Sequence, residues 1–316
     1  MLIKIKSTLA KNLYWSITIV VFSIFIGCGK ETGPIAEPKP VTNTDPGNSG
    51  YNHIFKSNEG GYFCFRIPAI VKTKAGTLLA FAEARKNNCG DEGDIDMVVK
   101  RSADKGKTWS ALSVIWSDAE NTCGNPAPVV DQITGKIHLL MTWNLGTDDI
   151  STINNGTSKD TRRVYKTSST DDGQTWASPK EITTDVKLVA WGWYATGPCH
   201  GIQISKGTYK GRLVIPCDNI ERGAGRKGYS HVIYSDDNGE NWKLGGVTPP
   251  ISVNPYESTV AELADGRLIL NMRVSNNNNL RMKSISADGG LSWSIPVDAI
   301  SLVDPVCQGS IINATI

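Results

Sequence analysis

The chain repeats one octapeptide pattern four times, as SADKGKTW (102–109), STDDGQTW (169–176), SDDNGENW (235–242) and SADGGLSW (286–293). The aspartate at the third position can accept backbone N–H bonds across a turn, the glycine permits a positive φ, and the tryptophan can pack into the layer beneath. Each octapeptide therefore predicts a hairpin turn between two strands. Its aspartate is predicted to be structural and not catalytic, which applies to Asp104, Asp171, Asp237 and Asp288.

The segments between the octapeptides are predicted to be short strands. Runs such as TLLAFAEAR (77–85), IHLLMTW (137–143) and RLILNMRV (267–274) are apolar or alternating, and they lack a helical period. The octapeptides begin 67, 66 and 51 residues apart, which suits repeated four-stranded sheets with unequal loops. The sequence therefore predicts an all-β fold of the propeller type, with about four to five blades in this chain.

The first 28 residues have the pattern of an export signal. Lys4, Lys6 and Lys11 precede the apolar run 13–26, which is too short for a typical spanning helix. Gly27-Cys28 follows and resembles a bacterial lipobox, so residues 1–28 are predicted to be a lipoprotein-type signal with Cys28 as the lipidation site. A plain signal peptide or an N-terminal anchor is the alternative. We expect a protein of the bacterial cell envelope, lipid-anchored in the outer membrane or periplasm, or otherwise a secreted protein.

Composition separates a tether from a domain. Residues 29–50 are rich in Pro, Gly, Thr and Asn and are predicted to be a flexible tether, and 51–316 form the predicted domain.

The 33 Lys and Arg nearly balance the 31 Asp and Glu, so no basic field indicates nucleic acid. The six cysteines after Cys28 match no zinc or CxxC spacing. A disulfide such as Cys89–Cys123 is one possibility, because the connectivity cannot be read from the sequence.

Two segments outside the octapeptides resemble those of one family. Phe65-Arg66-Ile67-Pro68 resembles the FRIP motif of sialidases, and PYESTVAELADGRLILNMR (255–273) resembles their segment with two glutamates and an arginine. The octapeptides are similar to the Asp boxes, or BNR repeats, found in sialidases and in other propellers. The resemblance covers residues 51–316 and implies a six-bladed β-propeller that acts as an exo-α-sialidase, a glycoside hydrolase releasing terminal α-linked sialic acids with retention. It implies sialylated glycans as partners and no metal or other cofactor.

The resemblance also implies roles for individual side chains. Arg66 and Arg273 match arginines that bind the substrate carboxylate, for which a planar, permanently charged fork is well suited. The alternative for Arg66 is a buried arginine paired with a structural acid. Glu257 matches the base that activates a tyrosine nucleophile, and Glu262 is predicted to be a structural carboxylate.

A loop after the FRIP-like motif supplies the candidate acid–base residue. Asp91 follows Arg85 by six residues, and the resemblance implies that Asp91 acts as general acid and then as general base. Asp94 is the alternative, and Glu92 is a further rival in the same loop. Arg85 is expected to contact the substrate carboxylate or to support the residues that do.

Two further segments fit the resemblance. WGWYATGPCHGIQI (191–204) resembles a sialidase loop, so Trp191, Trp193 and Tyr194 are candidates for a pocket wall, with core packing as the alternative. CGNPAPVVD (123–131) is interpreted as a turn between blades.

The resemblance places two expected functional residues outside this sequence. Its final match is DPVCQGS (304–310), and the third arginine and the tyrosine nucleophile of the family are expected beyond Ile316. Three other hypotheses stay open. They are a non-catalytic propeller that binds sialic acid or another carbohydrate, an inactive truncated sialidase, and an Asp-box propeller without specificity for sialic acid.

Overall fold

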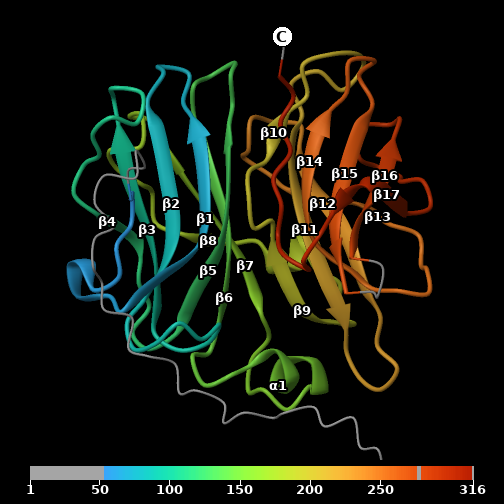
Figure 1. Ribbon diagram of the computed structural model, residues 1–316, viewed down its shortest axis with the longest axis horizontal. Helices are drawn as coiled ribbons and strands as arrows, with labels where there is room; N and C mark the ends of the chain where they lie inside the picture. The colour runs from blue at the N-terminus through green and yellow to red at the C-terminus, as the bar shows by residue number, and fades with distance from the viewer. Residues whose placement is uncertain (1–52, 276–278, 315–316) are drawn as a thin grey trace, which may run out of the picture. The chain divides into compact units, whose positions relative to one another are not determined.

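A computed structural model describes residues 53–275 and 279–314 of the chain, and Tyr51–Ile316 form one compact unit. The predicted signal (1–28, with Cys28) and the predicted tether (29–50) lie outside the described residues. Within the described ranges nearly all of the regular secondary structure is strand, which confirms the predicted all-β class (Figure 1).

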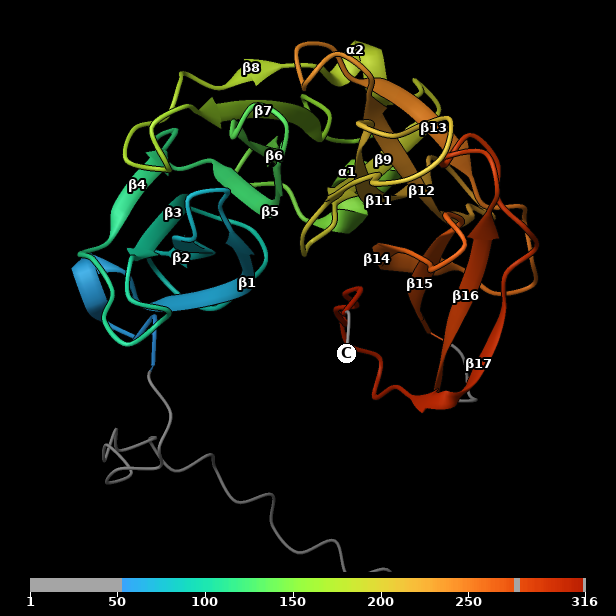
Figure 2. The same ribbon diagram turned by 90° about the horizontal axis from the view of Figure 1, so that it is seen from above.

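Four antiparallel blades follow one another along the chain, as β1–β4, β5–β8, β9–β13 and β14–β17. A single parallel residue pair, Ile95 with Thr122, joins the first two blades into one sheet. Figure 2 shows the blades arranged around a common centre, with β1 and β14 on the inside and β4 and β17 on the outside. The strands are β1 Cys64–Lys72, β2 Leu78–Arg85, β3 Ile95–Ser102, β4 Ser113–Trp116, β5 Thr122–Val130, β6 Ile137–Asn144, β7 Arg163–Ser169, β8 Lys180–Glu181, β9 Trp191–Thr196, β10 Ile202–Gln203, β11 Leu213–Glu221, β12 Gly228–Ser235, β13 Lys243–Val247, β14 Pro255–Glu262, β15 Leu268–Val274, β16 Leu280–Ser286 and β17 Val297–Val303.

The helical segments are short and lie in connections between strands. They are the 3-10 turn η1 (Glu59–Gly61), α1 (Ile150–Asn155) and α2 (Thr183–Val186). The Asp149 carboxylate caps α1 by accepting the N–H of Thr152 at 2.6 Å. None of the helices in the described ranges has the length and apolar character needed to span a lipid bilayer.

Every octapeptide forms the turn between the last two strands of its blade. In the first, Ser102 Oγ accepts from the N–H of Gly106 and donates to Asp104 Oδ1, both at 2.8 Å, and this oxygen accepts the N–H of Thr108 at 2.9 Å. The other three octapeptides repeat these three bonds. The predicted structural role of the four aspartates is confirmed. The fourth position also takes a positive φ, which the sequence pattern did not reveal, at Lys105, Asp172, Asn238 and Gly289.

The octapeptide carboxylates should make stability depend on acid pH. Hydrogen bonds from the Thr108 hydroxyl, the Thr108 N–H and the Ser102 hydroxyl lower the pKa of Asp104 from 3.8 to about 2. Because the pKa is lower in the folded protein, the stabilisation is complete above pH 3.8 and is lost as the pH falls toward 2. We expect the melting temperature of Asp104→Asn to change less than that of the wild type across this window. Parallel profiles of the two proteins would contradict this explanation.

Each octapeptide from the second onward also contacts the preceding blade. Asp172 accepts from Thr77 Oγ1 at 2.5 Å, Lys166 Nζ donates to the Gly239 carbonyl at 2.9 Å, and Arg212 Nη1 donates to the Gly289 carbonyl at 3.0 Å. The octapeptide tryptophans also contact the preceding blade. For example, Trp176 packs edge-on against Phe81, with ring centres 5.6 Å apart. The octapeptides therefore fix the spacing between blades as well as the turns.

The hydrophobic core lies between neighbouring blades. Separate clusters of buried side chains join the first blade to the second, the second to the third and the third to the fourth. The pairs Leu79 with Leu139, Leu140 with Leu213, and Val214 with Leu270 represent these three clusters, and all six side chains are fully buried. Such burial provides the main free energy that holds one sheet against the next.

The first strand of each blade has a break in its pairing register. The breaks fall between Arg66 and Ala69, between Gly124 and Ala127, between β9 and β10, and between Pro255 and Ser258. Three of them contain a residue of positive φ followed by proline, namely Ile67-Pro68, Asn125-Pro126 and Gly197-Pro198. A break of this kind bends the strand and redirects its side chains.

Two sequence interpretations are corrected by these elements. The segment 123–131 is not a turn between blades, because Thr122–Val130 is the fully buried strand β5. Its Asn-Pro pair marks the register break, where proline interrupts no ladder bond. The disulfide joins Cys64 to Cys89 and not Cys89 to Cys123, because β1 and β2 pair Cys64 with Arg85 and the following loop returns Cys89 to within a Cα distance of 5.5 Å. Cys123 is a buried free thiol.

Candidate active site

A cavity of about 440 Å³ collects most of the candidate residues. It is formed where the first strands begin and the second strands end, so the register breaks in β1 and β14 help to direct Arg66 and Glu257 toward it. Its lining includes the predicted residues Arg66, Arg85, Asp91, Trp193, Glu257 and Arg273 together with Ile67, Glu83, Glu92, Asn125, Asp148, Asp149, Ile150, Arg162, Val306, Cys307 and Gln308. Residues that are far apart in the sequence are thus brought together from all four blades.

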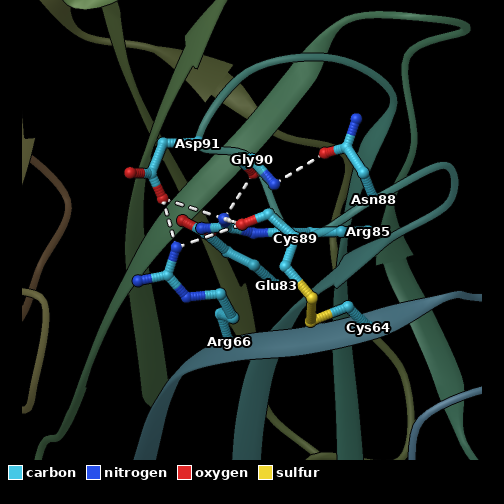
Figure 3. Close-up of a disulfide and its surroundings, with 8 residues drawn as sticks. All are labelled: Cys64, Arg66, Glu83, Arg85, Asn88, Cys89, Gly90 and Asp91. Carbon is cyan, nitrogen blue, oxygen red and sulfur yellow. Dashed lines mark hydrogen bonds and ion pairs between the residues drawn. A yellow bond between two sulfur atoms is a disulfide. The ribbon is translucent and has the colours of Figure 1, made fainter. Parts of the chain in front are cut away.

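Asp91 lies between two arginines of this cavity. Its Oδ1 is 2.9 Å from Arg66 Nη1 and 2.8 Å from Arg85 Nη1 (Figure 3). The Asp91 side chain is 66% exposed, whereas Arg85 is only 2% exposed. The buried Arg85 holds the Asp91 carboxylate in place, and the exposed part of this carboxylate can reach a molecule bound in the cavity. A residue that donates and accepts protons needs both properties.

The two rivals of Asp91 occupy different places. Asp94 forms an ion pair with Lys86 at 3.1 Å at the base of the loop and does not line the cavity. Glu92 does line the cavity. Of the two aspartates considered, only Asp91 faces the arginines.

Arg85 is held in place by Glu83, a residue that the sequence did not indicate. Glu83 Oε2 accepts from Arg85 Nε at 3.1 Å, and Glu83 Oε1 accepts the N–H of Asn125 at 2.8 Å. The Glu83 carboxylate is buried, so its two oxygens are matched by one charged and one backbone donor. This arrangement also explains why Asn125 lies in a register break of β5, since the break turns its N–H away from the ladder.

Glu257 and Arg273 form the second charged pair of the cavity. Glu257 Oε2 is 2.5 Å from Arg273 Nη1, and the two residues lie on the paired strands β14 and β15. Burial opposes the charge of Arg273, but the hydrogen bond and the charge of Glu257 outweigh it and raise the pKa of Arg273. Arg273 is thus a permanent cation at the cavity wall, and Glu257 is a carboxylate within its field.

A buried acid lies close to this pair. Asp218, fully buried in β11, interacts electrostatically with Glu257, Arg162 and Arg273. Burial, followed by repulsion from Glu257, raises the pKa of Asp218 well above its usual range. Burial and the neighbouring Glu257 side chain therefore both favour the neutral form of Asp218.

Arg162 is a further cavity residue without a sequence signal. Its guanidinium group lies 3.8 Å from the centre of the Trp193 ring, and it donates to the Tyr194 carbonyl at 2.7 Å and to the side chains of Asn125 and Asn144. Burial lowers the pKa of Arg162 to about 10, which still leaves it charged at neutral pH. The Trp193 ring therefore packs against a cation at the wall of the cavity.

Only one of the three predicted wall aromatics lines the cavity. Trp191 and Tyr194 belong to the core between the second and third blades, where each lies about 5 Å from the His231 ring. The register shift in the pairing of β9 with β11 places both on the same side of the strand, away from Trp193. For Trp191 and Tyr194, the core alternative is correct.

Glu262 has the structural role predicted for it. Its Oε2 accepts the N–H of Ser205 at 2.8 Å and its Oε1 accepts the N–H of Lys206 at 3.0 Å. It thereby joins the fourth blade to the third, at a distance from the Glu257 carboxylate along β14. Within the described residues, no group of three His, Cys, Asp or Glu side chains is arranged to hold a metal ion.

The fold and the four turns define an Asp-box β-propeller, and residues 76–314 match the family model described as a BNR repeat-like domain. The chain is 34% identical to a sialidase of Clostridium perfringens, over 88% of this chain and 72% of that protein. It is 33% identical to an exo-alpha-sialidase of Aspergillus fumigatus, over 80% of this chain. A solved structure named Hadza microbial sialidase Hz136 superposes with a TM-score of 0.71 at 31% identity, covering 81% of this chain and 51% of that one.

The chain belongs to the sialidase family. It spans about 61% of the length of its Aspergillus relative and 49% of a Bacteroides fragilis sialidase to which it is 33% identical. A Trypanosoma rangeli sialidase and an intramolecular trans-sialidase from Ruminococcus gnavus, which are 23% and 18% identical to this chain and were solved with bound ligands, share the fold.

Proposed function

We propose that the protein is an exo-α-sialidase that hydrolyses terminal α-linked sialic acids with retention of configuration. The observation that carries this proposal is a single cavity lined by Arg66, Arg85 and Arg273 together with the carboxylates of Asp91 and Glu257. A sialic acid has a carboxylate on its anomeric carbon, so its binding calls for clustered guanidinium groups. Its hydrolysis calls for one acid–base carboxyl and one base, and sialylated glycans are the proposed substrates.

In this proposal each charged residue has one task. Arg66 and Arg273 bind the substrate carboxylate, and Arg85, with its Glu83 partner, anchors Asp91. Asp91 protonates the leaving-group oxygen and then removes a proton from the incoming water. Glu257 removes the proton from the nucleophilic hydroxyl, which in the sialidase resemblance belongs to a tyrosine.

The test is the hydrolysis of a fluorogenic sialoside by the wild-type protein as its gene encodes it. Arg273→Leu is the matched variant, because it removes the cation and keeps much of the volume. Turnover in the wild type that is lost in Arg273→Leu supports the proposal. Saturable binding of sialic acid to the wild type without turnover would instead favour a carbohydrate-binding propeller.

We further propose that the protein is exported and lipid-anchored at Cys28. The Cys64–Cys89 disulfide supports export, since disulfides persist in oxidising compartments outside the cytosol. Incorporation of a labelled fatty acid by the bacterial host, measured for the wild type and for Cys28→Ala, tests the anchor. Equal labelling of the two proteins would refute it.

A further inference from the structure

The loop that carries Asp91 is attached to the fold at two points. At its base, the N–H of Lys86 donates to the Asp94 carbonyl at 3.1 Å. Nearer its tip, the disulfide joins Cys89 to Cys64 at the start of β1 (Figure 3). The covalent attachment lies two residues before Asp91 in the loop and two residues before Arg66 in β1.

Cys89 also shares its hydrogen-bond donors with Asp91. The Cys89 carbonyl accepts from Arg66 Nη1 at 3.1 Å and from Arg85 Nη1 at 2.7 Å. These are the two nitrogens that contact Asp91 Oδ1. The Cys89 carbonyl and the Asp91 carboxylate are therefore bound by the same pair of guanidinium groups, and the Gly90 carbonyl is a further acceptor for Arg85 Nη1. The disulfide holds Cys89, which provides the first of these acceptors.

The ion pair with Arg66 contributes little to holding Asp91 in place. The Arg66 and Asp91 side chains are 44% and 66% exposed, and exposed ion pairs contribute little to the position of a loop. The backbone near Asp91 is also permissive, because Gly90 precedes it and Gly93, with a φ of +108°, follows it. A substrate carboxylate that binds Arg66 removes one of the two charged partners of Asp91.

We propose that the Cys64–Cys89 disulfide is a positioning device that keeps the Asp91 carboxyl in place when the substrate engages Arg66. The disulfide holds the Cys89 main chain, and Arg85 holds Asp91 from the buried side. The catalytic consequence rests on the proposed sialidase function, whereas the structural consequence does not. Loss of the disulfide should therefore release the loop and weaken protonation of the leaving group, with little effect on the binding of the carboxylate.

The experiment compares the wild type, Cys64→Ser/Cys89→Ser and the control Cys123→Ala, which removes a buried thiol and keeps the disulfide. The first readout is hydrogen exchange of the amides in residues 88–94, which requires no turnover. The second is kcat and KM on two sialosides, one with a nitrophenol leaving group and one with a sugar leaving group. A nitrophenolate departs without protonation, whereas a sugar hydroxyl needs the general acid.

We expect faster exchange in 88–94 only in the double serine variant. We also expect its kcat to fall about tenfold or more for the sugar leaving group, to change much less for nitrophenol, and KM to stay close to that of the wild type. If the double variant does not fold, the disulfide of the folded wild type can be reduced instead. Titration of the two thiols released, those of Cys64 and Cys89, shows that the reduction is complete, and the same readouts are then compared.

Unchanged exchange in 88–94, or equal loss of kcat on both sialosides, would overturn the inference. A wild type that hydrolyses neither sialoside would refute the proposed function. In that case the exchange measurement still decides whether the disulfide holds the loop, so the two failures can be distinguished.

Discussion

Glu257→Gln should abolish most sialoside turnover while leaving the protein folded. The substitution keeps an oxygen for Arg273 Nη1 but removes the charge and the ability to accept a proton. Since a positioned general base contributes about 10²–10⁴ in rate, we expect kcat to fall by about that factor. Steady-state kinetics on a fluorogenic sialoside, with the melting temperature as a check on folding, measure the effect.

Glu262→Gln is the matched control for this experiment. It makes the same chemical change on the same strand, but Glu262 binds the backbone of Ser205 and Lys206 and not a cavity residue. We expect a lower melting temperature and an unchanged kcat per folded molecule. A similar loss of kcat in both variants would show that the effect comes from damage to the fourth blade and not from loss of a base.

Gly239→Ala should be among the most destabilising small substitutions in the described residues. Gly239 has a φ of +81°, and a Cβ there would lie 2.2 Å from Cε1 of His138, a buried side chain of the preceding blade. Left-handed backbone costs about 1–2 kcal/mol for an L-residue, and overpacking costs about 1–3 kcal/mol more. We therefore expect a loss of about 2–5 kcal/mol in the free energy of unfolding, measured by denaturant titration.

Gly207→Ala separates the two contributions. Gly207 has a φ of +68°, but nothing lies within 4 Å of the position of its Cβ. It should lose only the backbone part, about 1–2 kcal/mol. Equal losses in the free energy of unfolding at Gly207 and Gly239 would mean that the His138 side chain moves aside at little cost. The contact between this octapeptide and the preceding blade would then not be tightly packed.

The features of the fold that could be predicted were those that repeat. A Ser, an Asp, a Gly and a Trp at fixed positions specify one local hydrogen-bond pattern, so the four turns followed directly from the octapeptides. The register breaks were missed, although Ile67-Pro68, Asn125-Pro126 and Gly197-Pro198 recur in successive first strands. The segment 123–131 was interpreted as a turn, but it is a buried strand, and such a strand can contain proline where the ladder is already interrupted.

The candidate site was predictable where the sequence carried a motif and not elsewhere. Arg66, Glu257 and Arg273 lie in recognisable segments, and the cavity brings them together. Glu83 and Arg162 have no such signal, because their importance comes from contacts with Asn125 and Trp193, which are distant in the sequence. The pairing of Cys64 with Cys89 likewise depends on the register of β1 and β2.

The position of the octapeptides has a consequence for engineering the protein. Strand β3 (Ile95–Ser102) begins at the loop of Asp91 and ends at the first octapeptide, so the two lie at opposite ends of a strand roughly 25 Å long. The second blade has the same order, with the connection 145–162 before β7 and an octapeptide after it. Randomised libraries confined to the lining positions Glu92, Asp148 and Ile150 would therefore vary the mouth of the cavity while the contacts that the octapeptides make between blades stay untouched. Selectivity among glycans could then be evolved without first adding stability to the scaffold.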